Sequence, residues 1–134
     1  MAVFHTTEEL YDVMDDLWTW IKSNEIIAAK LLQSRLVVRF HYRNPDGMMT
    51  VDGSDGQELK YTFGECDAQP TVQMYMDSDL AHRFWLGKVN IPAALISGEL
   101  VSKGPVNKAL ALVPAVRPAH KIYPAIAARR GKAA

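Results

Sequence analysis

Residues 77–108 read DSDLAHRFWLGKVNIPAALISGELVSKGPVNK, and this stretch decides the fold. Two short helices are predicted in it, and Gly87, Gly98 and Gly104 separate them from the elements that follow. The apolar side chains of the first helix point in nearly all directions, and no charge lies between Lys88 and Glu99. Because a sheet covers only one side of a helix in so small a domain, we expect the other side to face a partner, a membrane or an internal apolar cavity.

Before this stretch, period-two alternation predicts three strands of a meander and then a fourth strand. The segment Asn44-Pro45-Asp46-Gly47 has favoured residues for a type I turn, so the second strand should return antiparallel to the first. Leu100 to Lys103 adds a short fifth strand. The alternating apolar positions are Leu36, Val38, Phe40 and Tyr42 in the first strand, Met49 and Val51 in the second, Leu59, Tyr61 and Phe63 in the third, and Val72, Met74 and Met76 in the fourth.

Two helices are predicted ahead of the strands. The first begins near Thr6, where Thr6 and Glu9 have the spacing of a capping box, and the second runs from Glu25 to about Gln33. Trp18 and Trp20 lie on opposite edges of a broad apolar stripe on the first helix. This arrangement suits a lid over a wide sheet face or cavity, and a plain core helix with tryptophans at its margins explains it equally well.

Composition indicates a single globular domain over residues 1–134. The chain is 49% hydrophobic, which is enough to build a core at this length. Its formal net charge of +0 argues against nucleic acid as a partner, because phosphate binding needs an excess of Lys and Arg. Cys66 is the single cysteine, so no disulfide forms within the chain. With neither a signal peptide nor a membrane span in the sequence, we expect a cytoplasmic protein.

Catalytic and metal-binding patterns are scarce, and we expect neither a metal nor a cofactor. The histidines show no paired spacing, and no nucleophile turn, phosphate loop or dinucleotide fingerprint is present. Asp77, Asp79 and His82 come closest to a catalytic cluster. They lie at a predicted helix start, where an acid caps the helix and suits its dipole, so the structural interpretation is favoured over an acid/base role.

The stretch also carries a family resemblance, in Leu86-Gly87-Lys88, in residues 93–100 and in Lys103-Gly104-Pro105. These motifs fall in a predicted series of elements: a strand, a helix, a short apolar helix, a strand and a closing helix. In that order of elements and motifs, the chain resembles the sterol carrier protein type two family over roughly residues 35 to 113. The resemblance implies an α+β fold with a five-stranded, twisted, mainly antiparallel sheet. It also implies helices on one face that enclose an apolar tunnel, which holds fatty acids, fatty acyl-CoA or sterols without chemistry.

From this resemblance and from the apolar pattern we expect a non-enzymatic protein that binds and transfers lipids. Methionine suits a pocket wall that adapts to flexible acyl chains, although strand methionines are more often core filling. The expected lipid-binding residues are Trp18, Met74, Phe84, Trp85, Leu95, Ile96, Leu110, Val113 and Ile122.

Two alternatives from other classes remain open. One is a small cavity enzyme that uses Asp77, Asp79 or His82 on a steroid or an acyl thioester. The other is an accessory domain whose apolar helices dock on a lipid-metabolising enzyme or on an identical subunit to form a homodimer. The expected partners are therefore a lipid or acyl-CoA ligand, with transient contact to a membrane surface or to such an enzyme.

The tail at residues 115–134 matches no motif of the family. Pro114 is expected to end the preceding helix, Pro118 fits a helix start, and Pro124 must kink or restart that helix. Residues 115–130 form either a docked terminal helix or a lid over one mouth of the cavity. In the lid, Arg117, Lys121, Arg129 and Arg130 would place positive charge where an anionic headgroup approaches.

Overall fold

A mixed sheet of five strands forms the framework of the protein, in a computed structural model that describes residues 2–132. The strands are β1 (Val37–Arg43), β2 (Gly47–Asp52), β3 (Lys60–Phe63), β4 (Val72–Asp77) and β5 (Leu100–Lys103), and they lie in the order β3-β2-β1-β4-β5. The helices are α1 (Thr7–Ser23), α2 (Glu25–Ser34), α3 (Ser78–Trp85), α4 (Ile91–Ser97), α5 (Val106–Leu110), α6 (Val113–Val116) and α7 (Ala119–Arg129).

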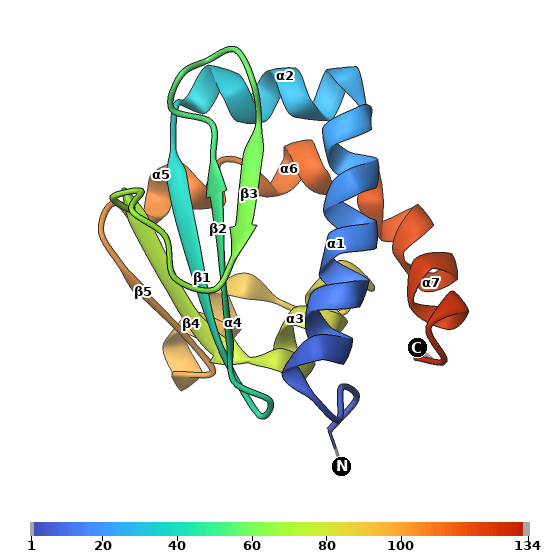
Figure 1. The fold of residues 1–134 in the computed structure, drawn as a ribbon. Helices are drawn as coiled ribbons and strands as arrows, with labels where there is room; N and C mark the ends of the chain where they lie inside the picture. The colour runs from blue at the N-terminus through green and yellow to red at the C-terminus, as the bar shows by residue number, and fades with distance from the viewer. Residues whose placement is uncertain (1, 133–134) are drawn as a thin grey trace.

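The sheet is antiparallel except at its centre, where β1 and β4 run parallel. Helices α3, α4, α5 and α6 lie behind the sheet in Figure 1, while α1 and α7 stand together at its side. The predicted α+β class, with a mainly antiparallel five-stranded sheet and helices on one face, is confirmed. The element order is also the predicted one: helices, three strands, a crossover strand, helices, a strand and helices.

The connection from β3 to β4 crosses the outer face of the sheet, as Figure 1 shows. It must cross β2 and β1, because β4 pairs with β1 while β3 pairs with β2 on the far side. Arg39 fixes the connection, since its Nη2 donates to the carbonyl oxygen of Ala68 over 2.7 Å. The helix-facing side of the sheet is thereby left to the apolar core.

The helix ends follow the local sequence signals. The Thr6 side chain accepts from the backbone N–H of Glu9 at the start of α1, and Asn24 and Asn90 cap α2 and α4 in the same way. The turn between β1 and β2 differs from the expected type I turn. Asn44 has a φ of 56°, which asparagine tolerates better than most residues, and its bond to Pro45 is cis.

One expectation about proline was wrong. Pro114 does not end a helix but lies in the first turn of α6, where a missing N–H costs nothing because that N–H has no partner inside the helix. Pro124 was expected to kink or restart its helix, and it does not restart it, because α7 runs from Ala119 to Arg129 with Pro124 inside it. Its side chain is exposed, so the ring meets no neighbouring element, and packing of the opposite side holds the helix together.

Helix α7 is docked against α1 (Figure 1). Tyr123 and Ile126 are buried to 1% exposure or less, and burial of side chains of this size contributes about 1.5–3 kcal/mol each. The Arg130 guanidinium donates to both carboxylate oxygens of Asp16 at 2.9 and 3.1 Å. The apolar face of α7 therefore belongs to the main core, and its last turn is anchored to α1.

Candidate functional site

An apolar cavity of about 130 Å³ lies between the sheet and the helices. On the sheet side it is lined along the strands from Leu36 to Tyr42, a span of roughly 20 Å at the usual rise per residue. A row of β4 side chains, Met74 and Met76, runs beside it in register with Phe40 and Tyr42. The cavity is thus elongated in the direction of the two parallel strands.

Helices close the other sides of the cavity. Phe84 and Trp85 come from the last turn of α3, and Ile91 comes from the first turn of α4. Helices α5 and α6, with the residues between them, add a third wall. The residues of that wall are Ala109, Leu110, Leu112, Val113 and Val116.

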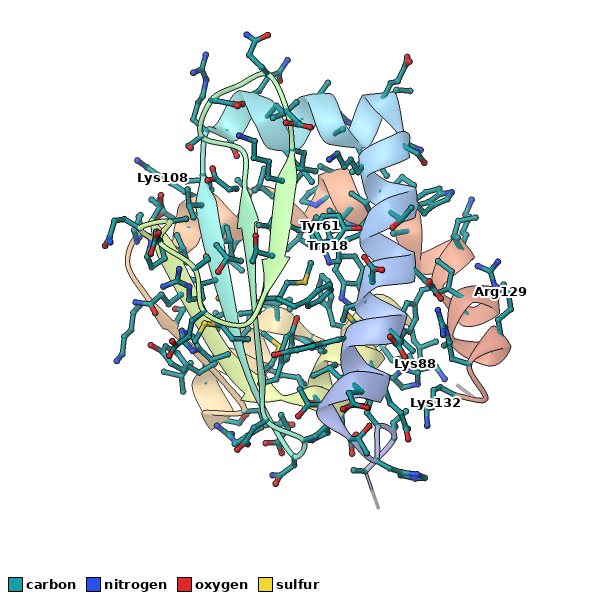
Figure 2. The ribbon with its side chains drawn as sticks, viewed as in Figure 1. Trp18, Tyr61, Lys88, Lys108, Arg129 and Lys132 are labelled. Atoms are coloured by element: carbon teal, nitrogen blue, oxygen red, sulfur yellow. The ribbon has the colours of Figure 1, made fainter. Side chains whose placement is uncertain are left out.

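Trp18 reaches the cavity from α1 and meets Trp85 edge to face. Figure 2 shows Trp18 beside Tyr61 of β3, and the two ring centroids lie 6.5 Å apart. Both tryptophans are buried, at 4% and 6% exposure. The wide apolar stripe of α1 therefore serves as both core and cavity wall, which joins the two interpretations that the sequence left open.

No lysine, arginine, histidine, aspartate or glutamate is among the described residues that line the cavity. The side chains with polar atoms are Trp18, Ser34, Tyr42 and Trp85. Ser34 is satisfied within the protein, because its Oγ donates to the carbonyl oxygen of Leu31 at 2.6 Å and accepts from the N–H of Leu36 at 3.2 Å. The wall is suited to an apolar ligand, and it has no charged side chain that could pair with a charge on the ligand.

The predicted lipid-binding residues separate into two groups. Trp18, Met74, Phe84, Trp85, Leu110 and Val113 line the cavity. Leu95, Ile96 and Ile122 do not, and Ile96 is 88% exposed. Helix α4 meets β5 with only Ala94 buried, so Ile96 points to the outside, and Ile122 lies on α7, which packs on α1 away from the cavity.

The outer side of α4 does not face the cavity. The side of this uncharged helix away from the sheet was expected to face a partner, a membrane or the cavity, and among the described residues nothing covers Ile96. Alanine and proline make up much of the rest of this short helix. Ile96 is thus the one large apolar side chain exposed on α4, which a folded surface tolerates.

Several cavity residues were not singled out from the sequence. Phe40 and Tyr42 were recognised only as strand positions, and Leu112 and Val116 lie in segments with no clear period. The alternation in β1 was the one usable signal, because Val38, Phe40 and Tyr42 must share the helix-facing side of the sheet. Which of those positions faces a cavity depends on helices that pack there from elsewhere in the chain.

The cluster of Asp77, Asp79 and His82 does not reach the cavity. Arg43 pairs with Asp77, and Asp79 accepts from the backbone N–H of Val3 over 2.8 Å. His82 is buried at 2% exposure, and its Nδ1 lies 2.6 Å from the hydroxyl oxygen of Tyr123 on α7. All three residues connect elements of the fold. The expected capping was not found, because Asp77 precedes α3 but its side chain makes no capping hydrogen bond.

Of the cations in the tail, Arg130 is engaged with Asp16 of α1, whereas Arg117, Lys121 and Arg129 are exposed. Lys108 of α5 lies on the opposite side of the molecule from Arg129 in Figure 2. Among residues 2–132, no group of three His, Cys, Asp or Glu side chains is placed to hold a metal ion. None of the helices described is long and apolar enough to cross a bilayer.

Solved structures of sterol carrier proteins have this fold. The sterol carrier protein domain 2 of Helicoverpa armigera matches with a TM-score of 0.63 and 20% identity, over 84% of this chain and 89% of that one. Sterol carrier protein 2 from Yarrowia lipolytica, in its apo form, matches with a TM-score of 0.58 and 17% identity, over 85% of this chain and 88% of that one. The predicted resemblance is therefore confirmed at the level of the fold.

The same fold is also found inside a larger enzyme. The stereoselective inverting sec-alkylsulfatase from Pseudomonas sp. matches with a TM-score of 0.53 and 11% identity, and the match covers 62% of this chain but 14% of the sulfatase. No family model matches the sequence, and no curated protein sequence is significantly similar to it.

Proposed function

We propose that this protein binds a lipid in the cavity between sheet and helices and that it does so without catalysis. The observation that supports this most directly is the wall itself, which is formed mainly by apolar side chains and has no charged side chain among the described residues. Burial of apolar surface then supplies the binding free energy, at roughly 25 cal/mol per Å². The sterol carrier proteins that share the fold support the same proposal.

A long-chain ligand requires the cavity to widen. Its volume of about 130 Å³ is below the roughly 300–1,000 Å³ of typical ligand pockets. The wall best able to move is formed by α5 and α6, which have five and four residues and whose lining residues Leu110, Leu112 and Val113 are half-buried. The ligand therefore enters past these short helices and displaces them outward from the sheet.

The ligands proposed are long-chain fatty acids, fatty acyl-CoA and sterols. An elongated wall along β1 and β4 fits a chain or a flat ring system, and Met74 and Met76 adapt to either. A headgroup with phosphates would remain outside, because no cation among the described residues lines the cavity. We propose that the protein then releases the bound lipid to a membrane surface or to a lipid-metabolising enzyme.

The proposal excludes a role in catalysis for the polar cluster on α3. A general acid or base must lie within hydrogen-bond reach of the reacting group, and Asp77, Asp79 and His82 lie outside the cavity wall. Each of them has a partner from another part of the chain: Arg43, Val3 and Tyr123 respectively. Their arrangement holds the fold together.

A pair of glutamate substitutions tests the proposal. Leu110→Glu places a carboxylate at the cavity wall, where it must be desolvated or remain in water and draw α5 outward. Ile96→Glu places the same charge on the exposed side of α4. Uptake of a fluorescent long-chain fatty acid, measured by emission titration, should fall at least tenfold in affinity for Leu110→Glu and stay within twofold of the original for Ile96→Glu.

Equal uptake by both variants and the original protein would place the probe outside this cavity. No uptake by any of the three folded proteins would overturn lipid binding itself. Far-ultraviolet circular dichroism and thermal unfolding of both variants establish that each one is folded before the titrations are compared.

One observation favours a second function, that of an accessory domain that docks on an enzyme. The fold forms 14% of the length of a sec-alkylsulfatase, and here Ile96 exposes an apolar side chain on an uncharged helix. Sedimentation equilibrium of the purified chain tests docking on an identical subunit. A homodimer that Ile96→Glu dissociates would support this function, and a monomer at all concentrations would exclude self-association.

A further inference from the structure

Tyr42 is the last apolar-face residue of β1, and its side chain lines the cavity. In the register of the sheet it lies beside Gly47 of β2 and Met76 of β4, and Met76 in turn lies beside Leu100 of β5. Tyr42, Met76 and Leu100 are buried, with 7%, 8% and 5% exposure. The wall opposite, at Leu110 and Val113, is half-buried. Tyr42 therefore lies at one end of the cavity, among buried residues.

The hydroxyl of Tyr42 has no hydrogen-bond partner among residues 2–132, although more than nine-tenths of the residue is buried. Burial raises the pKa of Tyr42, with smaller contributions from the nearby Tyr123 and Tyr11, so the hydroxyl keeps its proton. Tyr123 and Tyr11 are engaged elsewhere: Tyr123 with His82, and Tyr11 with the backbone N–H of Met48. A protonated hydroxyl on a cavity-lining residue, with no partner among the described residues, remains available to bond a guest in the cavity.

We propose that the Tyr42 hydroxyl binds a neutral oxygen at one end of the lipid, a hydroxyl or a carbonyl, so that this end lies innermost. The inference rests on the proposed function, since it concerns the same cavity. Tyr42 then sets the direction of the ligand and selects lipids that carry such an oxygen over pure hydrocarbons. The apolar remainder of the ligand extends along β1 towards Leu36.

The neutrality of the oxygen follows from the absence of charge in the wall. An ionised carboxylate at Tyr42 would lose its hydration, and no Lys, Arg or His among the described lining residues would offset that loss. A hydroxyl or carbonyl loses far less on leaving water, and one hydrogen bond replaces most of what it loses. Indole N–H groups of Trp18 and Trp85 also lack an acceptor among residues 2–132, so a second oxygen is accommodated on the same wall.

The test compares 1-decanol with n-decane, two ligands of equal chain length that differ by one hydroxyl. Each is titrated from an ethanol stock against the original protein and the variant Tyr42→Phe, with tryptophan emission as the signal. Tyr42→Phe keeps the ring and removes the hydroxyl, so the ratio of the decanol affinity to the decane affinity should fall roughly three- to tenfold. Tyr75→Phe, on the outer face of the sheet, is the matched control and should leave the ratio unchanged.

Three outcomes separate the inference from the proposed function. A reduced ratio in Tyr42→Phe alone supports the role of Tyr42. Binding of both ligands with the same ratio in all three proteins overturns that role and leaves lipid binding intact. No binding of either ligand by the original protein overturns the proposed function and this inference together.

Orientation is tested on the unmodified protein, which removes any dependence on how the variant folds. With bound 1-decanol, nuclear Overhauser effects from the Tyr42 ring should reach the C1 methylene and not the terminal methyl group. The reverse pattern contradicts the proposed direction. Decanoate at pH 8 supplies the charged comparison, and it should bind at least tenfold more weakly than 1-decanol. Equal or tighter binding of decanoate would overturn the selection of a neutral oxygen.

Discussion

Trp18 of α1 and Trp85 of α3 meet edge to face in the cavity wall, with ring centroids 5.9 Å apart and an interplanar angle of 87°. This geometry is one that aromatic pairs prefer, and it joins two helices that are far apart in the sequence. The third tryptophan, Trp20, packs on the core without lining the cavity. Two of the three indoles therefore report on the cavity, and the remaining one provides an internal reference.

Ligand binding should change the emission of Trp18 and Trp85. A bound saturated long-chain alcohol fills the cavity next to both rings and changes their surroundings. The wavelength of the emission maximum of the original protein should therefore shift on titration. Trp20→Phe should keep the whole ligand-dependent change, whereas Trp18→Phe and Trp85→Phe should each lose part of it. An undiminished change in the Trp18→Phe/Trp85→Phe double variant would place the ligand elsewhere.

The contact between His82 and Tyr123 should stabilise the fold without affecting the cavity. Both residues are almost completely buried, and neither lines the cavity wall. Tyr123→Phe removes the hydroxyl that lies 2.6 Å from Nδ1 of His82, which should lower the free energy of unfolding by about 1–3 kcal/mol. Urea unfolding measures this difference.

Tyr75→Phe is the control for that substitution, because the Tyr75 hydroxyl bonds Gln73 at 3.3 Å on the outer face of the sheet. It should change the free energy of unfolding by less than about 0.5 kcal/mol. Ligand affinity should be the same in Tyr123→Phe as in the original protein. A large loss of affinity with unchanged stability would restore the polar cluster on α3 to a functional role.

Gly104 should be far less tolerant of a side chain than Gly98. Both have a positive φ, 92° and 83°. A Cβ on Gly104 would lie 2.4 Å from the carbonyl oxygen of Thr71, whereas a Cβ on Gly98 would meet no atom within 4 Å. Gly98→Ala should lower the free energy of unfolding by about 1–2 kcal/mol, because alanine is strained at a positive φ. Gly104→Ala should lower it by at least about 1 kcal/mol more, because of the added clash. Equal thermal shifts in the two variants would contradict the close approach of β5 and the start of β4.

Acid should loosen the C-terminal end of α7 from α1. The hydrogen bond from Lys132 lowers the pKa of Glu9, and the backbone N–H of His5 adds to the effect. A lowered pKa in the folded state means that the contribution of Glu9 is fully present above its unfolded value, near 4.3, and is lost as the pH falls through the folded value.

Hydrogen exchange of the amides at residues 127–132, corrected for intrinsic rates, measures this effect. Protection should be high at pH 7 and should decrease below about pH 4. In Glu9→Gln the protection should be lower at pH 7 and should depend less on pH. The same pH profile in both proteins would assign the loosening to other carboxylates.

The sequence predicted those parts of the fold that have local causes. Thr6 marks the start of α1 through its own side chain, and the alternation in β1 places Phe40 and Tyr42 on one face wherever the strand is paired. Gly87 and Gly98 end their helices with positive φ, as expected for residues without a Cβ. None of these features depends on distant contacts.

The predicted site residues that lie outside the cavity depend on tertiary packing. Leu95 and Ile96 belong to a helix that is apolar all round, so its sequence does not state which side faces inward. Ile122 belongs to a periodic helix whose partner proved to be α1 rather than the cavity. The unpaired hydroxyl of Tyr42 also has no sequence signal, because a missing partner is a property of the assembled core.

Native mass spectrometry of the purified protein, sprayed without added ligand, tests the central claim most directly. We expect the original protein to carry a co-purified lipid as a one-to-one complex, and we expect Leu110→Glu to yield the unliganded mass while Ile96→Glu keeps the complex. An unliganded original protein that also fails to take up added long-chain alcohol or fatty acid would contradict lipid binding in this cavity.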